Sequence, residues 1–200
     1  MKRLLASLLL TVATFANAAP ALTEQIGQLL ARPAVLRGEF EQQRQVQGFS
    51  KPLVSRGSFV VARGRGVLWS TRTPFASQLV LTQAQIRATQ DGKVNFQLDA
   101  AAEPAVRVIN SVLFGLLDGD VAALSAHFKL EGQVDGKAWR LSLQPSDAAL
   151  ARMMSRIELE GDQYVRRIRI FDASGDRSTL VFSAQREDAA LNTEEGKRLE

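Results

Sequence analysis

The sequence predicts an α+β domain built on one strongly curved antiparallel sheet whose concave face is covered by helices. Apolar and polar residues alternate with the strand period of two through most of the chain. Asp91-Gly92 and Asp135-Gly136 stand between such runs, as hairpin turns do. Three helical patches interrupt the strands, and helices inserted between consecutive hairpins pack onto one face of the sheet they interrupt.

The start of the chain predicts a cleavable export signal. A basic dipeptide is followed by an apolar run over residues 4–15, and Ala16-Asn17-Ala18 supplies the small-x-small pattern that signal peptidase cuts. The run is shorter than the roughly 20 apolar residues that a membrane-spanning helix needs, which leaves an uncleaved buried or interfacial helix as the weaker alternative. We therefore expect residues 1–18 to be removed and the mature protein to act outside the cytoplasm.

The composition predicts a single domain without disulfide bonds. The 182 residues left after cleavage suit one domain, which we place at residues 19–186 and follow with a polar tail at 187–200. The chain has no cysteine, which excludes disulfides, thiol catalysis, thiolate metal sites and a lipid anchor on an N-terminal cysteine. The net charge of +4 falls to about +2 without Lys2 and Arg3, and its signs are interspersed, so nucleic-acid binding is disfavoured. We expect a soluble monomer.

The first half of the domain predicts one helix and then a meander of strands. Residues 21–30 carry apolar side chains at helical spacing, with Thr23 as the N-cap and Pro33 beyond the end. From Val35 onward, largely apolar and charged positions alternate, as in a half-buried antiparallel strand. The strands of this half are expected at residues 35–42, 54–62, 66–71, 77–81, 85–89 and 94–98.

A helical insertion separates these strands from the second half. Pro104 precedes residues 105–117, whose apolar side chains recur every three or four positions, and Gly119 closes the pattern. Asp120 is placed to cap a shorter helical piece at 121–126. Strands are expected again at residues 128–133, 139–143, 156–160, 165–172 and 178–186, with one or two helical turns between 145 and 154. The polar tail is either a short helix around residues 193–199 or disordered.

Periodicity leaves two questions open. A strongly curved sheet encloses a space, and this space is either filled by side chains, as in an ordinary α+β core, or retained as a cavity. Arg166, Arg167 and Arg169 interleave with apolar residues on one strand. They form either the polar face of a half-buried strand or a basic docking patch.

Several short motifs follow one another in a distinctive order. After the N-terminal helix come Arg-Gly-Glu-Phe-Glu-Gln-Gln at 37–43, a glycine-led strand at 57–61, and then Arg63, six residues before Trp69. This succession resembles the LolA family of periplasmic lipoprotein carriers, and the likeness extends over nearly the whole mature chain. It implies a periplasmic protein with an unclosed β-barrel of about 11 strands and a helical lid, whose apolar interior receives the acyl chains of a lipidated cargo.

The resemblance also implies roles for individual side chains. The family's strand arginine holds the lid by hydrogen bonds to helix backbone and releases it when cargo enters. By spacing this lid latch is Arg63, while Gly64 stands where the family usually has proline and Arg65 is a competing candidate. A solvated charge at a strand end is the alternative for Arg63. The acyl cavity would be lined, or else simply packed, by Phe40, Phe59, Val61, Trp69, Phe75, Leu79, Leu81, Ile109, Leu113, Phe114, Leu117 and Trp139.

The partners implied by the resemblance are an acylated lipoprotein or lipid cargo, an inner-membrane releasing complex and an outer-membrane acceptor, with no cofactor. A fatty chain in water costs about 0.8 kcal/mol per methylene, so transport needs an apolar sleeve and no catalyst. The polar end at 192–200 departs from the family's apolar final strand, which is typical of a side branch with a different acylated or polyene cargo. The alternative function is a non-catalytic module on the same scaffold that senses lipid, lipoprotein or a partner protein.

Enzymatic functions have little support in the sequence. His127 is the only histidine, and no Gly-x-Ser-x-Gly motif accompanies it, which disfavours a serine hydrolase. One histidine without cysteine also disfavours zinc and iron sites. Asp118 with Asp120, and Glu158 with Glu160, are carboxylate pairs that we interpret as solvated charge. We expect no enzyme and no metal.

Overall fold

Eleven strands form one antiparallel sheet in the computed structural model, which describes residues 21–103, 112, 114–115, 120–146 and 148–200. The spatial order is β6-β5-β4-β3-β2-β1-β11-β10-β9-β8-β7, so β6 and β7 are free edges and the sheet does not close into a barrel. The predicted fold class is confirmed. The strands are β1 (Val35–Gln45), β2 (Leu53–Ala62), β3 (Gly66–Thr73), β4 (Ser77–Leu81), β5 (Gln85–Gln90), β6 (Lys93–Asp99), β7 (Phe128–Asp135), β8 (Ala138–Pro145), β9 (Met154–Gly161), β10 (Val165–Asp172) and β11 (Arg177–Asp188).

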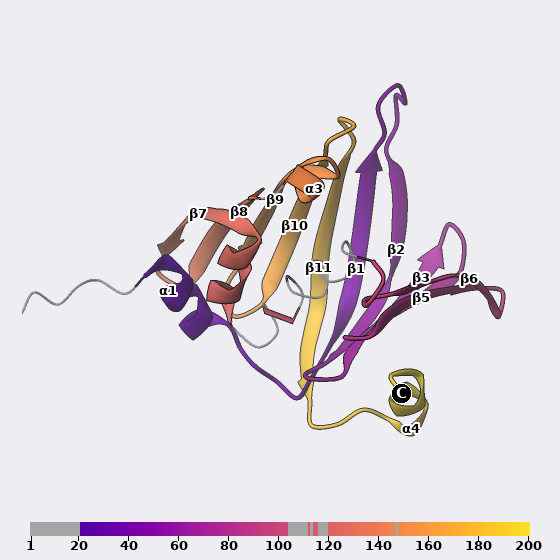
Figure 1. Cartoon of the computed structure of the whole chain (residues 1–200). Coiled ribbons are helices and arrows are strands. Elements are labelled where there is room, and N and C mark those ends of the chain that lie inside the picture. Colours follow the sequence, from indigo (N-terminus) through magenta and orange to yellow (C-terminus); the bar gives the residue numbers. More distant parts are fainter. Residues whose placement is uncertain (1–20, 104–111, 113, 116–119, 147) are drawn as a thin grey trace, which may run out of the picture.

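The two halves of the chain form two leaves that meet at the pair β1–β11. These are the longest strands, and Phe40 of β1 faces Phe182 of β11 in their register. A register shift between Arg37 and Glu39 bends the pair. Strands β1–β6 form the first leaf and β7–β11 the second, and Figure 1 shows β3–β6 turning away from the plane of β7–β11.

The hairpin turns lie where the sequence predicts them. Asp91 and Gly92 join β5 to β6 with φ of 51° and 75°. Positive φ at both central residues is the type I′ pattern that the right-handed twist of paired strands prefers. Gly136, at φ 59°, turns the chain between β7 and β8.

Short helices pack on the concave side of the second leaf (Figure 1). They are α1 (Leu22–Leu29), the 3-10 helix η1 (Val121–Ala126) and α3 (Ala148–Ala151). Ile26, Leu124 and Leu150 of these helices join a buried cluster with Trp139 and Leu141 of β8. This cluster is the main core of the second leaf.

The two predicted helix caps have different outcomes. The carboxylate of Asp120 accepts a hydrogen bond from the backbone N–H of Ala123 at 3.1 Å, as a cap of η1 does. The prediction for Thr23 is wrong, because the N-cap position is Ala21, two residues earlier, and α1 has no side-chain cap. Most of the helix predicted at 105–117 lies outside the described residues, although Phe114 is helical and packs against Phe59 on the first leaf.

The polar tail contains a helix, α4 (Thr193–Arg198), so the helical alternative is observed. It begins with a capping box between Asn192 and Glu195. Leu199, beyond its end, packs with Ala62, Leu68 and Val80 on the face of the first leaf opposite to Phe59 and Val61. Figure 1 shows α4 beside the lower end of β3–β5.

Two arginines hold this tail to the sheet. Arg37 of β1 donates to Asp188 at 2.5 Å and to Glu195, and its side chain is only 14% exposed. Arg65 donates to the carbonyl of Gly196 at 2.9 Å. Both contacts join the turn end of the first leaf to α4.

The arginines of β10 divide between the two faces. Arg167 bonds to Glu160 at 2.9 Å and Arg169 to Glu158 at 3.1 Å, so these two belong to a paired polar face and not to an uncompensated basic patch. Arg166 bonds instead to Asp162. Across the described ranges, from residue 21 to 200 with their gaps, no helix is long and apolar enough to cross a membrane.

Candidate functional site

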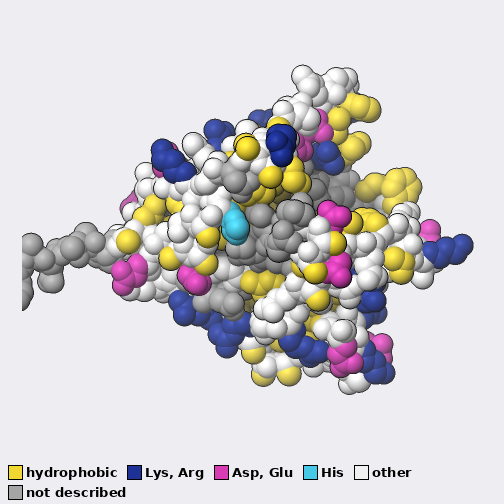
Figure 2. All heavy atoms as spheres, viewed as in Figure 1, with side chains coloured by type: hydrophobic (Ala, Val, Ile, Leu, Met, Phe, Trp, Pro, Cys, Tyr) yellow, Lys and Arg dark blue, Asp and Glu magenta, His cyan; other side chains and the backbone are white. Residues whose placement is uncertain are grey.

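An apolar cavity of about 230 Å³ lies against the concave face where the two leaves meet. This is larger than the engineered cavity of about 150 Å³ that binds benzene, so a segment of hydrocarbon chain has room here. In Figure 2, hydrophobic side chains gather around the middle of this face. The first leaf contributes Leu36, Phe59, Val61, Val67, Trp69, Leu79 and Leu81 to the lining. The rest comes from Leu30, Ala31, Pro33, Arg63, Gln163, Tyr164, Val165, Ile168, Leu180, Phe182 and Gln185.

Strand register collects these side chains on one face. Phe59 of β2 stands opposite Trp69 of β3, and Trp69 stands opposite Leu79 of β4. Residues two apart on a strand share a face, which adds Val61 and Leu81 to the same surface. The period-two alternation of the sequence therefore becomes one continuous apolar wall.

Aromatic rings form one end of this wall. Trp69 stacks on Phe40 at a centroid distance of 3.7 Å, and Phe59 meets Phe182 edge to face at 5.3 Å. Each phenylalanine of β1 and β2 covers a glycine on the neighbouring strand: a Cβ on Gly57 would lie 2.8 Å from the Phe40 ring. The missing side chains let the rings lie flat on the sheet.

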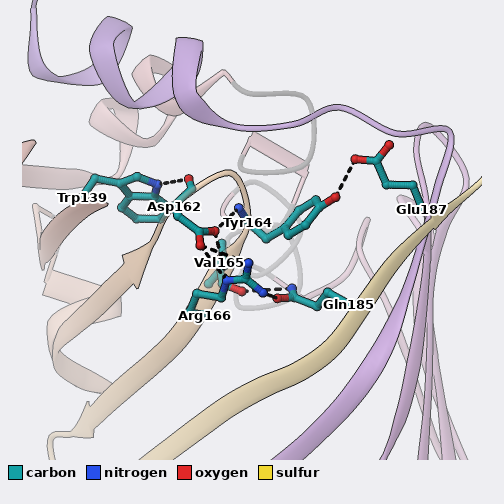
Figure 3. Close-up of polar contacts among 7 residues, drawn as sticks. All are labelled: Trp139, Asp162, Tyr164, Val165, Arg166, Gln185 and Glu187. Atoms are coloured by element: carbon teal, nitrogen blue, oxygen red, sulfur yellow. Dashed lines mark hydrogen bonds and ion pairs between the residues drawn. The ribbon is translucent and has the colours of Figure 1, made fainter. Parts of the chain in front are cut away.

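A polar cluster lies at the end of the cavity away from these rings, where Tyr164 and Gln185 are among the lining residues; Figure 3 shows its contacts. Tyr164, in the turn between β9 and β10, donates its hydroxyl to Glu187 of β11 at 2.6 Å. Arg166 donates to the carboxylate of Asp162 and, at 2.5 Å, to the amide oxygen of Gln185. The amide nitrogen of Gln185 donates in turn to the carbonyl of Val165 at 3.1 Å.

These contacts shift the proton affinities of two groups. The hydrogen bond to Glu187 and burial raise the pKa of Tyr164 to about 12, because both favour the neutral phenol. Burial raises the pKa of the Asp162 carboxyl, but hydrogen bonds from Arg166 and from the backbone N–H of Tyr164 outweigh it and hold that pKa below its ordinary value. The cluster is thus neutral at Tyr164 and a closed ion pair at Asp162.

Arg63 lies at the same end, in the turn after β2. Its backbone N–H donates to the carbonyl of Ala34 at 3.0 Å, and the neighbouring Ala31 donates to the carbonyl of Gln163 at 2.9 Å. The segment that joins α1 to β1 therefore holds the turns of both leaves together. The Arg63 side chain is exposed and makes no hydrogen bond or ion pair with the described residues, whereas Arg65 is bonded to Gly196.

Only some of the predicted cavity residues line the cavity in the structure. Phe59, Val61, Trp69, Leu79 and Leu81 line the cavity together with Arg63. Phe40 and Phe114 lie beside it, the first stacked on Trp69 and the second packed on the Phe59 cluster.

The other predicted residues lie elsewhere. Phe75 is 73% exposed on the β3–β4 hairpin. Trp139 is buried in the core of the second leaf, where its indole N–H donates to the carbonyl of Asp162 at 2.6 Å. Ile109, Leu113 and Leu117 lie outside the described residues.

Several lining residues escaped the sequence reading. Leu180 and Phe182 alternate on β11, and Leu36 on β1, but alternation does not tell which part of a strand reaches the cavity. Tyr164 and Gln185 have no sequence signal as a pair, since one comes from the β9–β10 turn and the other from β11. Among the residues that the structure describes, no group of three or more His, Asp and Glu is placed to hold a metal ion.

Comparisons with known proteins agree with this geometry. A family model described as "Outer membrane lipoprotein carrier protein LolA-like" matches residues 15–199. No curated protein matches the chain. The solved complex of MucA and MucB from Pseudomonas aeruginosa aligns with a TM-score of 0.52 at 15% identity, over 88% of this chain and 60% of that one. A LolA superfamily protein from Nitrosomonas europaea aligns with a TM-score of 0.48 at 10% identity, over 86% and 94%.

Proposed function

Because the chain belongs to the LolA-like family of outer membrane lipoprotein carrier proteins, we propose that it is a non-catalytic periplasmic carrier of acyl chains. It takes up the chains of a lipoprotein, or of a related lipidated product, and shuttles them from the inner to the outer membrane. An inner-membrane releasing complex and an outer-membrane acceptor are the partners that this role requires.

The apolar cavity is the observation that carries the proposal. Its walls are aliphatic and aromatic, and Arg63 is the only charged residue among the described residues that line it. Sheltering a chain from water is favourable by about 0.8 kcal/mol per methylene, which such walls provide without chemistry. The open sheet supports loading, because β6 and β7 are free edges and no strand pairing joins them.

Lipid occupancy is the first test. Native mass spectrometry of protein purified from the periplasm should show bound lipid, and the delipidated protein should take up a fluorescent fatty acid. Absence of both would remove the carrier proposal.

A matched pair of variants on β11 ties uptake to the cavity. Leu180 lines it, whereas Val181, the next residue, points to the opposite face and is 37% exposed. Leu180→Asn places an amide against the bound chain and should weaken uptake by at least about fivefold, since a poorly paired polar group there costs about 1–3 kcal/mol. Val181→Asn should bind like the wild type. Equal uptake by all three proteins would place the ligand somewhere else.

A second function is favoured by one observation. The best-aligned of the reported structures contains MucB together with MucA, so a chain of this fold is found in complex with a protein. The alternative is therefore a non-catalytic module that senses lipid, lipoprotein or a partner protein. Lipid binding without transfer between inner- and outer-membrane vesicles would favour this alternative over the carrier.

The lid latch stays a prediction. If Arg63 holds the lid, Arg63→Leu should prolong the retention of cargo, measured as slower release of a fluorescent fatty acid.

A further inference from the structure

We propose that the ligand of the cavity is an amphiphile whose anionic head group binds Arg63, with its acyl chain directed toward the aromatic rings. This inference rests on the proposed function and specifies the class of molecule that the site accepts. It follows from the distribution of charge around the cavity and from which polar groups remain available.

The charge of the lining is confined to one place. All described lining residues except Arg63 are uncharged, and the polar ones among them, Gln163, Tyr164 and Gln185, stand at the same end as Arg63. The carboxylates of the polar cluster, Asp162 and Glu187, are not part of the lining. The described lining therefore has an apolar body and one positively charged end.

The neighbouring polar groups already have partners. The hydroxyl of Tyr164 is donated to Glu187, and the guanidinium of Arg166 is shared between Asp162 and Gln185 (Figure 3). A ligand that used these groups would have to break short hydrogen bonds. They are better suited to shaping the end of the cavity than to binding a head group.

Within the part of the chain that the structure describes, the side chain of Arg63 has no hydrogen bond or ion pair. It is exposed, and it lines the cavity. A guanidinium carries five N–H donors in a planar fork that matches a carboxylate or phosphate. Because Arg63 is exposed, its charge is hydrated, and folding pays no desolvation cost for it.

The direction of the ligand follows from the strand. Arg63 lies four residues beyond Phe59 in β2 and its following turn, about 13 Å away at the usual rise of 3.3 Å per residue. A chain that starts at Arg63 passes Val61 and then reaches Phe59 and Trp69. The head group remains at the solvent-facing end while the tail is sheltered.

The test compares two ligands with the same acyl chain, one with a charged and one with an uncharged head group. A fluorescent fatty acid and its methyl ester are titrated into wild type, Arg63→Gln and the control Arg65→Gln. The wild type should bind the acid about 3- to 10-fold more tightly than the ester, as a partly exposed, charge-assisted contact warrants. Arg63→Gln should lose this preference and keep its affinity for the ester. Arg65→Gln should keep the preference, because Arg65 is bonded to Gly196 and does not line the cavity.

The outcomes separate this inference from the function on which it rests. Equal binding of acid and ester by the wild type would overturn the head-group site and leave the apolar carrier in place. Binding of neither would overturn both. Slower release of both ligands from Arg63→Gln would assign Arg63 to the lid and not to the head group. An alkyl phosphate of equal chain length distinguishes the two anions: tighter binding than the acid would assign a phosphate head group.

Discussion

Gly57→Ala is expected to destabilise the packing of β2 in the first leaf, because two neighbours occupy the place of the added methyl group. An ideal Cβ on Gly57 would lie 1.9 Å from the carbonyl oxygen of Ser70 and 2.8 Å from the Phe40 ring. This oxygen belongs to the backbone of β3, so it cannot rotate away as a side chain would. The strand must therefore shift by about 1 Å, and Phe40 must leave its position over Trp69.

The magnitude can be worked from these contacts. Overpacking a well-packed core costs about 1–3 kcal/mol. Losing the stacking of Phe40 on Trp69 adds about 0.5–1.5 kcal/mol. About 0.5–1 kcal/mol of this loss is offset, because alanine has less backbone entropy than glycine in the unfolded chain. We expect a net loss of about 2–3 kcal/mol, which corresponds to a Tm about 4–12 °C lower for a domain of this size.

Urea unfolding, followed by tryptophan fluorescence and by circular dichroism, measures this loss. Gly48→Ala is the matched control, because Gly48 has φ +85° and nothing within 4 Å of an added Cβ. The control carries only the cost of alanine in left-handed backbone, about 1–2 kcal/mol. If Gly57→Ala were as stable as the wild type, the close approach of β2, β3 and Phe40 would be refuted.

Two further predictions concern polar contacts. Tyr164 is the only tyrosine, so tyrosinate absorbance should report one titration near pH 12; a midpoint at the ordinary value of 10.0 would show that the Glu187 contact is absent. Because the folded pKa is the higher one, its stabilisation is complete below pH 10 and is lost as pH rises toward 12, and Tyr164→Phe should lack this loss. Arg37→Ala should cost about 2 kcal/mol in unfolding free energy and release α4 to amide exchange, since it leaves Glu195 without its cation. Burial raises the pKa of Glu195 but Arg37 holds it below its ordinary 4.5, so this contact stabilises above pH 4.5 and weakens as pH falls; unchanged exchange in α4 would contradict the contact.

Local features of the fold were predictable from the sequence because their causes are local. Asp91-Gly92 adopts the positive φ values that its turn requires, and Asp120 caps η1. The capping box of α4 also had a visible signal, since Asn192 stands three residues before Glu195. Which strands become neighbours across the leaves was not readable, because β1 pairs with β11 through residues from opposite ends of the domain.

The hardest property of the site to predict was which apolar side chains reach the cavity. Period-two alternation gives the face on which a side chain lies, but not whether that part of the strand reaches the cavity, a core or solvent. Phe59 and Phe75 look equally apolar in the sequence, yet the first lines the cavity and the second is exposed on a hairpin. Trp139 lies in the core of the second leaf because it is a residue of β8, and its indole N–H finds a partner there in the carbonyl of Asp162.

The pairing of β1 with β11 also determines when during synthesis the fold can be completed. Arg37 and Asp188, which meet at this pair, are 151 residues apart, so at a synthesis rate of about 5–20 residues per second the second partner follows the first by about 8–30 s. Until then β1 has only β2 beside it, and the two leaves have no common strand pair. The sheet that joins both leaves can therefore form only after β11 has been synthesised.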